Sequence, residues 1–551
     1  MSDSHQPAPV GSISRSEQQP EARAANIRAA RAIAETVRTS LGPAGRDKML
    51  IEDGTVIVTN DGSSILHHVD VTHPAASLLV RAAASQEDGP GDGTSSTVLL
   101  AGELLANAES LFEQGLHPTT VIDGYRLGLE HALGALDEIG TPVDGQDRAL
   151  LSNLAATTMT GRWDADRVEF LADLSVATAL AATRNGRVDL DRVALQTVPG
   201  GSVTDSTLVE GVAIDLDTSS TNVASFEPAR EHRSHSTVAL IDGELRVRTG
   251  DSVTTAAVET AAELDAIRQG EEAAVAEILD TLDRAGVEVV YCQKQAADRV
   301  ASRLGRAGIL VVERTRQDEF DALETVTGAE RVLAAEDVDQ SVLGQAGAVE
   351  RAEIGGEEFI TVTGENGDAH TLILRAGTEH VLDELKRIFD DSLSVLATAI
   401  ERGQVVPGGG GTEAWLAGAV RSQATGVGGK PQLAMEQFAD ALEALPKTLA
   451  ANAGRNPIDI MTALRAAQVE SGPEIGFHTD AGVSNVVEQG LLEPAELKRR
   501  LLTNAVEAAT VILRVDDVIA STKQPEESAD DSDGTPALHQ DEGGYPWAVG
   551  H

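Results

Sequence analysis

The stretch Gly91-Asp92-Gly93-Thr94-Ser95-Ser96 opens an apolar segment that continues to about Leu111. Glycines let a ligand approach the backbone closely, and the N–H groups at a helix N-terminus attract anions. Three successive hydroxyls add donors, and the carboxylate of Asp92 is a ligand that suits Mg²⁺. The stretch therefore indicates a phosphate site at the start of a helix. A plain helix N-cap made by Asp92 or Thr94 explains the same residues equally well.

Helical patterns surround this stretch and dominate both ends of the chain. Apolar residues recur at helical spacing over 21–40, and Ala/Leu-rich segments follow at 74–86 and 94–111. The helical pattern returns over 379–402, and a final helix is predicted at about 494–520. The simplest interpretation is one helical domain built from both termini, with other domains inserted into it.

Strands are predicted in two places. A hairpin is expected around Asp53-Gly54, a dipeptide typical of hairpin turns. In the centre of the chain, buried-strand runs at 236–241, 287–292 and 309–313 alternate with helical patterns such as 295–306. This alternation predicts an α/β domain, so the whole chain is expected to be a multidomain α+β protein.

The chain is strongly acidic. Its 551 residues contain 88 Asp and Glu against 43 Lys and Arg, which gives a formal charge of −45. This excess disfavours general binding of nucleic acid, which needs clustered basic side chains, and adsorption to an anionic membrane. Only seven of the basic residues are lysines. We interpret the composition as adaptation to concentrated salt, where a Debye length of about 3 Å at 1 M screens surface repulsion. An ordinary acidic, highly soluble protein is the alternative.

Several common kinds of site are excluded. Cys292 is the single cysteine, so an internal disulfide cannot form. No signal peptide is evident and no run of 18 apolar residues exists, so a cytoplasmic location is expected. A P-loop needs Gly-Lys followed by Ser or Thr, but the only Gly-Lys, at Gly429-Lys430, precedes Pro431. Neither a His-Glu-x-x-His motif nor a Gly-x-Ser-x-Gly motif occurs.

Other loops and acids have two interpretations on local grounds. Leu41-Gly42-Pro43 and the run from Pro407 to Gly411 are structural turns by default. Asp61, in Asn60-Asp61-Gly62, suits a turn. Asp391, on the predicted helix at 379–402, suits a solvated helix face. Each could instead contribute to a ligand site.

Taken together and in order, these loops resemble those of group II chaperonins, the family of the archaeal thermosome. The resemblance runs from about Glu21 to Ser521, nearly the whole ordered length that the sequence predicts. The motifs that carry it are Arg38-Thr39-Ser40-Leu41-Gly42-Pro43, Asp47-Lys48-Met49-Leu50, Thr59-Asn60-Asp61-Gly62, His73-Pro74-Ala75-Ala76, Gly91-Asp92-Gly93-Thr94, Asn452-Ala453-Gly454, Pro457-Ile458-Asp459 and the run from Ile512 to Ile519.

The resemblance implies a chaperonin fold with three domains: a mainly helical equatorial domain, a small α/β intermediate domain and an α/β apical domain with a helical lid. The equatorial domain would combine 21–146 with 394–523, and the intermediate domain 147–211 with 363–393. The apical domain would be 212–362, with its lid at about 242–275. A flexible N-terminal arm at 1–20 and a disordered acidic tail at 524–551 are expected to flank them.

The resemblance also implies an ATPase whose cofactors are ATP and Mg²⁺ and which assists protein folding. The partners would be unfolded clients and the same or paralogous subunits in a double ring, in the cytoplasm of a halophilic archaeon. Asp61 and Asp391 are similar to the family's pair that positions and deprotonates the attacking water, with Asp391 brought in by domain closure only when ATP is bound. Asp92 is similar to the Mg²⁺ ligand. The remaining nucleotide-binding residues implied in this way are Gly42, Pro43, Gly93, Thr94, Ser95, Ser96, Thr158, Arg162, Gly409, Gly410 and Glu493.

The sequence departs from the family's pattern at a few positions. Ser95 stands where Thr is usual, Arg162 where Lys is usual beside the nucleotide, and Ala44 where Lys is common. Arginine keeps the charge but lacks the point-donor geometry of lysine. These departures leave an alternative, in which the chain is a non-hydrolysing structural or specialised paralogue subunit of a mixed ring.

Overall fold

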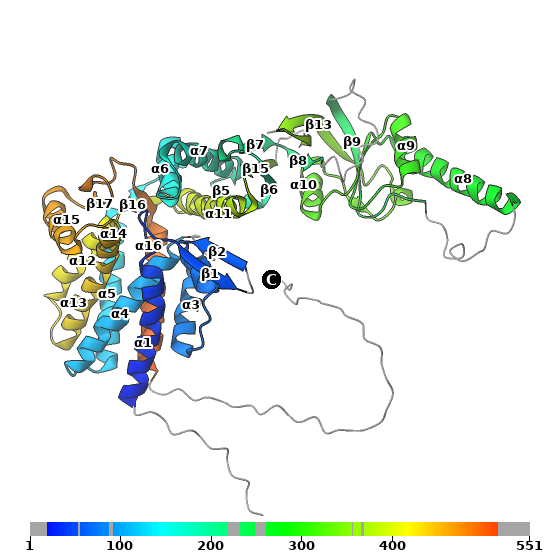
Figure 1. Ribbon diagram of the computed structural model, residues 1–551. Helices are drawn as coiled ribbons and strands as arrows, with labels where there is room; N and C mark the ends of the chain where they lie inside the picture. Colours follow the sequence, from blue (N-terminus) through cyan, green and yellow to red (C-terminus); the bar gives the residue numbers. More distant parts are fainter. Residues whose placement is uncertain are drawn as a thin grey trace, which may run out of the picture.

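The computed structural model describes residues 19–52, 55–87, 92–216, 232–247, 261–354, 356–364 and 369–515. Both ends of the described chain contribute helices to one bundle (Figure 1). The N-terminal part supplies α1 (Gln19–Arg38), α2 (Gly62–His67), α3 (Pro74–Glu87), α4 (Thr94–Glu113) and α5 (Pro118–Ile139). The C-terminal part supplies α12 (Gly411–Ala424), α13 (Lys430–Leu442), α14 (Ala444–Asn452), α15 (Pro457–Ser471) and α16 (Ala495–Arg514).

Helix α4 lies at the centre of this bundle. It packs against α1 and α3 from the N-terminal part and against α13 and α16 from the C-terminal part. Its consecutive side chains from Val98 to Leu100 are all buried, as are Leu104 and Leu105. Consecutive residues face different sides of a helix, so α4 is covered on several sides and lies in the core. Packing from both ends of the chain therefore fixes the position of its N-terminus, where the glycine loop lies.

Short strands join the loops at the upper end of the bundle. β16 (Gln404–Pro407) pairs antiparallel with both β19 (Leu492–Pro494) and β3 (Thr141–Pro142). The predicted hairpin forms as β1 (Lys48–Glu52) and β2 (Thr55–Thr59), and β17 (Ile475–His478) forms another hairpin with β18 (Gly482–Asn485). The β16–β19 pairing sets Val406 opposite Glu493, so two loops of the predicted site lie side by side.

Three helices and a small sheet lie next to the bundle, on the side of the large sheet (Figure 1). The helices are α6 (Arg148–Met159), α7 (Ala165–Ala182) and α11 (Glu379–Arg402). In the sheet, β15 (His370–Ala376) lies between β6 (Val193–Pro199), which is parallel to it, and β7 (Thr207–Glu210), which is antiparallel. The remaining short elements here are β4 (Thr183–Arg184), β5 (Arg187–Val188), η1 (Leu190–Arg192) and η2 (Val203–Asp205).

The central part of the chain forms a seven-stranded mixed sheet. Its order is β11 (Leu310–Val312), β10 (Val289–Cys292), β9 (His232–Ile241), β13 (Gly344–Ile354), β14 (Glu357–Gly364) and β8 (Val212–Asp215), with β12 (Arg331–Val332) also paired to β9. Alternate residues of a strand face opposite sides of the sheet. Val289 and Tyr291 accordingly pack toward α10 (Gln317–Thr327), while Val290 and Cys292 pack toward α8 (Ala261–Ala285) and α9 (Asp298–Arg306). The sheet is therefore a layer between helices, and the predicted α/β centre is confirmed.

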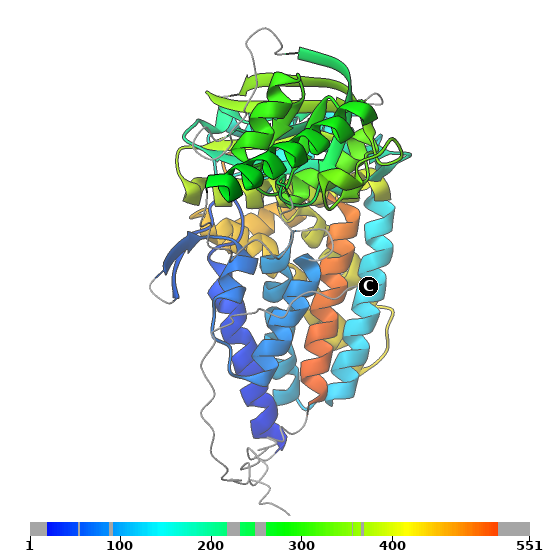
Figure 2. The same cartoon turned by 90° about the vertical axis from the view of Figure 1, so that its right-hand side faces the viewer.

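The bundle and the seven-stranded sheet lie at opposite ends of the molecule, with α6, α7 and α11 between them (Figure 1). The turned view agrees, because the green elements of the sheet region lie above the long helices of the bundle (Figure 2). Helix α8 extends away from the sheet at the far end. Within the described parts of the chain, no helix is long and apolar enough to cross a lipid bilayer.

Some predicted boundaries shift or fall outside the described residues. The first helix spans Gln19–Arg38 rather than residues 21–40. Residues 1–18 of the expected arm, residues 248–260 of the expected lid and the whole of the expected tail at 524–551 lie outside the described parts. The short strands β16 and β19 were not predicted, because three or four residues carry no recognisable alternation.

Candidate functional site

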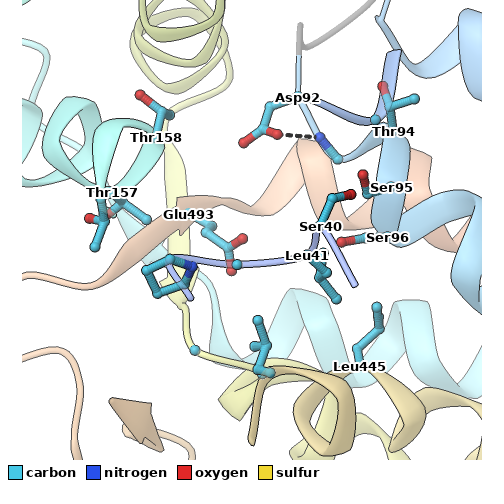
Figure 3. A pocket seen from close by; sticks show the side chains of 18 of the residues that line it. Ser40, Leu41, Asp92, Thr94, Ser95, Ser96, Thr157, Thr158, Leu445 and Glu493 are labelled. Atoms are coloured by element: carbon cyan, nitrogen blue, oxygen red, sulfur yellow. Dashed lines mark hydrogen bonds between the residues drawn. The ribbon is translucent and has the colours of Figure 1, made fainter. Parts of the chain in front are cut away.

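The N-terminus of α4 is built around Gly93. This residue is the N-cap and has a φ of +86°, a left-handed conformation that favours glycine. Because Gly93 has no side chain, the first N–H groups of α4 receive no side-chain cap from it, so the simple N-cap by Asp92 or Thr94 was wrong. The Oδ1 of Asp92 instead accepts a 2.6 Å hydrogen bond from the N–H of Gly93, the dashed line in Figure 3. The N–H groups at the start of α4 therefore receive no side-chain cap, which suits the binding of an anion.

Asp61 lies at the start of α2, against the same helix end. Its Oδ2 accepts a 2.8 Å hydrogen bond from the N–H of Ser64, so it caps α2. A Cβ atom on Gly62 would come within 2.1 Å of the Ser95 hydroxyl, which shows how closely the starts of α2 and α4 approach. Asp61 is therefore both a turn residue and a member of the site, and the two interpretations offered by the sequence are not exclusive.

Helix α11 brings Asp391 to Asp61. Nη1 of Arg387 lies 2.9 Å from Oδ1 of Asp61 and 3.1 Å from Oδ2 of Asp391. The Asp391 side chain is 26% exposed, so the solvated helix acid that local sequence favoured was wrong. Asp61 and Asp391 therefore face a common guanidinium in this structure, and Arg387 is a residue that sequence reasoning missed.

One cavity contains every residue that the sequence assigned to the site. Its volume is about 230 Å³, more than ten times the roughly 10–15 Å³ that one water molecule needs. Figure 3 shows Asp92 and the three hydroxyl residues on one side, Thr157 and Thr158 on another, and Glu493 between them. The predicted residues on its wall are Gly42, Pro43, Asp61, Asp92, Gly93, Thr94, Ser95, Ser96, Thr158, Arg162, Asp391, Gly409, Gly410 and Glu493.

Two glycines after β16 allow the chain to pass close to the opposite wall. Gly409 and Gly410 have φ values of +60° and +70°. A Cβ atom on Gly409 would lie 2.4 Å from the carbonyl oxygen of Phe477, and one on Gly410 would lie 2.6 Å from Cβ of Pro446. Neither position has room for a side chain, so the two glycines are needed for the turn itself. Because they carry no side chains, they also leave space in the cavity that they line.

An ion triad forms part of the cavity wall, with Lys498 and Glu413 buried and Glu493 24% exposed. Nζ of Lys498 lies 2.7 Å from Oε1 of Glu413 and 2.6 Å from Oε2 of Glu493. Burial raises the pKa of Glu493, although Lys498 opposes that shift. Burial would lower the pKa of Lys498, but the two carboxylates outweigh it and the pKa is raised. The ammonium therefore stays charged and compensates two acids.

The sequence carried a signal for this triad that was missed. Lys498 occupies the buried stripe of α16 together with Leu501, Leu502 and Ala505, at helical spacing. Glu413 occupies the buried stripe of α12 in the same way. A charged residue on an apolar stripe needs a partner, because an unpaired buried charge is very unfavourable. The second oxygen of Glu413, Oε2, is buried without a hydrogen-bond partner and belongs to a residue that lines the cavity.

Arg162 lines the cavity and pairs with Glu384. Its Nη1 lies 2.9 Å from Oε1 of Glu384, and the same oxygen lies 2.8 Å from Nη2 of Arg387. Burial raises the pKa of Glu384, opposed by Arg162 and assisted by Asp61 and Asp47. The four side chains Arg162, Glu384, Arg387 and Asp61 therefore form a continuous ionic chain from the loop after α6 to the start of α2.

The arrangement suits a phosphorylated ligand. The backbone at the start of α4 and the hydroxyls of Thr94, Ser95 and Ser96 are donors for anionic oxygens. Asp92 supplies one carboxylate, which fits Mg²⁺ because this ion commonly uses one or two carboxylates together with phosphate oxygens and water. The unpartnered Oε2 of Glu413 and the carboxylate of Glu493 offer acceptors elsewhere on the wall. The cavity therefore offers donors for the anionic phosphates of a nucleotide and acceptors for hydrogen-bond donors elsewhere on the same ligand.

Comparisons with known proteins agree with this geometry. Residues 33–523 match the TCP-1/cpn60 chaperonin family. The thermosome subunit alpha of Halobacterium salinarum is 41% identical over 518 residues, 93% of this chain and 91% of that protein. The thermosome subunit of Methanopyrus kandleri is 40% identical, covering 91% of this chain and 92% of that protein. Thermosome subunit 1 of Haloferax volcanii is 39% identical, covering 96% and 92%. The chain belongs to the TCP-1/cpn60 chaperonin family.

Proposed function

We propose that this protein is a subunit of a group II chaperonin, which encloses unfolded proteins in a double ring and assists their folding by binding and hydrolysing ATP. Family membership and the thermosome relatives indicate the ATP-dependent folding function. The observation that carries the hydrolytic part is that Asp61 and Asp391 share a cavity with the N-terminus of α4. Phosphoryl transfer depends mainly on such positioning and on compensation of charge.

The phosphates are assigned to the start of α4. Gly93 lets the ligand approach the backbone, and Thr94, Ser95 and Ser96 donate hydrogen bonds to phosphate oxygens. Gly42 and Pro43 cover the ligand from the loop after α1, and Gly409 and Gly410 from the turn after β16. Asp92 would hold Mg²⁺, which offsets the negative charge of the phosphates when bound. Glu493 and Thr158 would contact the sugar and base region.

The two remaining acids are assigned to the attacking water. Asp61 is fixed by its bond to Ser64 and cannot swing freely, so it suits orientation of the water. Asp391 would accept the water's proton, because a carboxylate within hydrogen-bond reach of a nucleophile can act as a general base. Since Asp391 belongs to α11, any movement of that helix changes its distance to the phosphate site. Hydrolysis is thereby coupled to movement.

The domain boundaries proposed from the sequence are supported by separate hydrophobic cores. One core joins residues between Ile27 and Leu136 to residues between Val406 and Leu513, in keeping with an equatorial domain of 21–146 and 394–523. Two others cover the faces of the seven-stranded sheet, in keeping with an apical domain of 212–362. A further core joins α6, α7 and the small sheet to the part of α11 before residue 394, in keeping with an intermediate domain of 147–211 and 363–393.

Contact with further subunits is supported by the β1–β2 hairpin. Met49 and Val58 form one cross-strand pair, and Ile51 and Val56 form another. All four side chains are exposed, Ile51 by 72%. A contiguous exposed apolar face on a hairpin is a typical subunit contact. A homo-oligomeric or mixed ring would cover it.

The alternative, a subunit that does not hydrolyse ATP, is not favoured. The alternative was motivated by Arg162 and Ala44, which stand where lysine is usual. Arg162 nevertheless keeps a cation at the cavity, and the carboxylates of Asp61, Asp92 and Asp391 all line it.

The direct test is ATP turnover by the purified assembly in high salt. Asp61→Ala with Asp391→Ala should abolish turnover and leave nucleotide binding intact. Turnover at the wild-type rate in the double variant would disprove the assignment, and absence of turnover in the wild-type assembly would favour the alternative.

A further inference from the structure

We propose that Arg387 is a positioning residue that holds Asp61 and Asp391 facing each other, and that Glu384 in turn fixes Arg387. This inference deepens the proposed function, because it gives the two acids of that site a common support. It concerns residues on α11 and at the start of α2 that are far apart in the sequence and that no local motif connects.

The guanidinium of Arg387 is committed to carboxylates on all sides. Nη1 contacts Asp61 at 2.9 Å and Asp391 at 3.1 Å. Nη2 contacts Glu384 at 2.8 Å, and Nε donates to the other oxygen of Glu384 at 3.2 Å. The two-point contact with Glu384 fixes the plane of the guanidinium, because a fork of parallel donors matches a carboxylate in one orientation. The direction of Nη1 is then fixed as well.

The two acids need such a support because they repel each other. Their oxygens lie on the same nitrogen and can be no farther apart than the sum of the two distances, 6.0 Å. Both side chains are partly buried, with 16% and 26% exposure, so water screens them incompletely. Without the guanidinium, repulsion would turn the two carboxylates apart. With it, both carboxylates are held on the same nitrogen.

The support extends to a third segment. Glu384 also binds Arg162, which follows α6 and lines the cavity. Gly161, next to it, packs so closely on Pro43 that a Cβ atom would come within 2.1 Å of the Pro43 carbonyl oxygen. The ionic chain therefore joins the loop after α6, helix α11 and the start of α2. An arginine is needed at residue 387, because the point charge of a lysine cannot bind Glu384 by a fork and two aspartates at once.

The test replaces Arg387 in the full-length assembly and separates turnover from binding. Arg387→Met should lower kcat for ATP by about 10- to 100-fold, the size of effect seen when an outer-shell partner of a site is removed, while the Kd for ATP stays close to that of the wild type. Arg387→Lys should recover part of kcat. The matched control is Arg331→Met. Arg331 is 21% exposed against 22% for Arg387 and also pairs with two acids, but it lies on the seven-stranded sheet. Its loss should leave kcat unchanged.

A second measurement does not depend on ATP turnover. The melting temperatures of Arg387→Met, Asp61→Asn and the double variant form a cycle without nucleotide. The double variant should be destabilised by less than the sum of the single shifts, because each single change removes the same contact. Additive shifts would contradict the proposal that Arg387 holds Asp61 in place. So would a wild-type kcat in Arg387→Met, or a rise in the Kd for ATP as large as the fall in kcat, which would make Arg387 a direct ligand contact. If the wild-type assembly does not hydrolyse ATP but the cycle is non-additive, the proposed function is refuted while the positioning role of Arg387 is supported.

Discussion

Asp61 and Asp391 are 330 positions apart in the chain, yet both lie within 3.1 Å of one nitrogen of Arg387. Asp61 is anchored to the bundle by its cap on α2, whereas Asp391 belongs to a helix that leaves the bundle toward the seven-stranded sheet. The pair therefore connects the bundle to a helix that runs toward the seven-stranded sheet. The expectation that Asp391 joins the site only when ATP is bound stays a prediction.

Lys498 is predicted to be essential to the wall of the cavity. Lys498→Met keeps the length of the side chain but leaves the buried Glu413 and the partly buried Glu493 without their cation. Removal of one partner from a buried ion pair is strongly destabilising, by about 3–5 kcal/mol. We expect a lower melting temperature and weaker nucleotide binding, measured by thermal unfolding and titration calorimetry.

The control for this prediction is Lys447→Met. Lys447 also pairs with a buried acid, Glu443, but it is 40% exposed and Glu443 keeps the arginines Arg421 and Arg465. Its loss should have a small effect. Adding Glu413→Gln to Lys498→Met should recover part of the stability, since only one buried carboxylate then remains charged. A double variant no more stable than the single one would contradict the role of Lys498 in compensating charge.

The buried side chain of Glu319 leads us to expect that the stability of the protein depends on pH. Its side chain is 4% exposed, and burial raises its pKa to about 7, although Arg316 opposes that shift. Between about pH 4.5 and pH 7 the folded chain binds a proton that the unfolded chain does not bind. The free energy of unfolding therefore falls as pH rises through this window, by up to about 3 kcal/mol from this group.

Glu319→Gln should remove that contribution. The melting temperature of the variant, compared with that of the wild type, should rise steadily from pH 4.5 to pH 7 and then level off. Glu353→Gln, at an exposed glutamate of strand β13 in the sheet that α10 packs against, is the control and should give a difference that does not vary with pH. A constant difference for Glu319→Gln as well would show that Glu319 stays ionised in the folded protein throughout.

Low salt is predicted to weaken the protein. At a formal charge of −45, repulsion between surface carboxylates grows as the Debye length rises from about 3 Å at 1 M salt to about 10 Å at 0.1 M. We expect the melting temperature and the fraction of intact rings in electron micrographs to fall when salt is reduced over this range. Rings that stay intact at low ionic strength would contradict adaptation to salt and support the ordinary acidic protein.

Sequence reasoning predicted the parts of the fold that depend on local patterns. Long helices such as α4 carry apolar periodicity over many residues, and the glycine turns carry their own backbone signals. It did not predict β16 and β19, whose pairing joins Val406 to Glu493 across a large sequence separation. It also missed Arg387, because Glu384 and Asp391 at helical spacing are equally typical of a solvated arginine, and the third acid, Asp61, is distant in sequence. The charge on the stripe of α16 could have revealed Lys498.

The most direct test of the central claim is ATP-dependent refolding of a chemically unfolded client protein in high salt, by the wild-type assembly and by Asp391→Asn. Both should bind ATP and capture the client. We predict that ATP raises the yield of active client only with the wild-type assembly, because the variant lacks the carboxylate that would deprotonate the water. An equal ATP-dependent yield from both assemblies would contradict the account, since folding would then proceed without hydrolysis at this cavity.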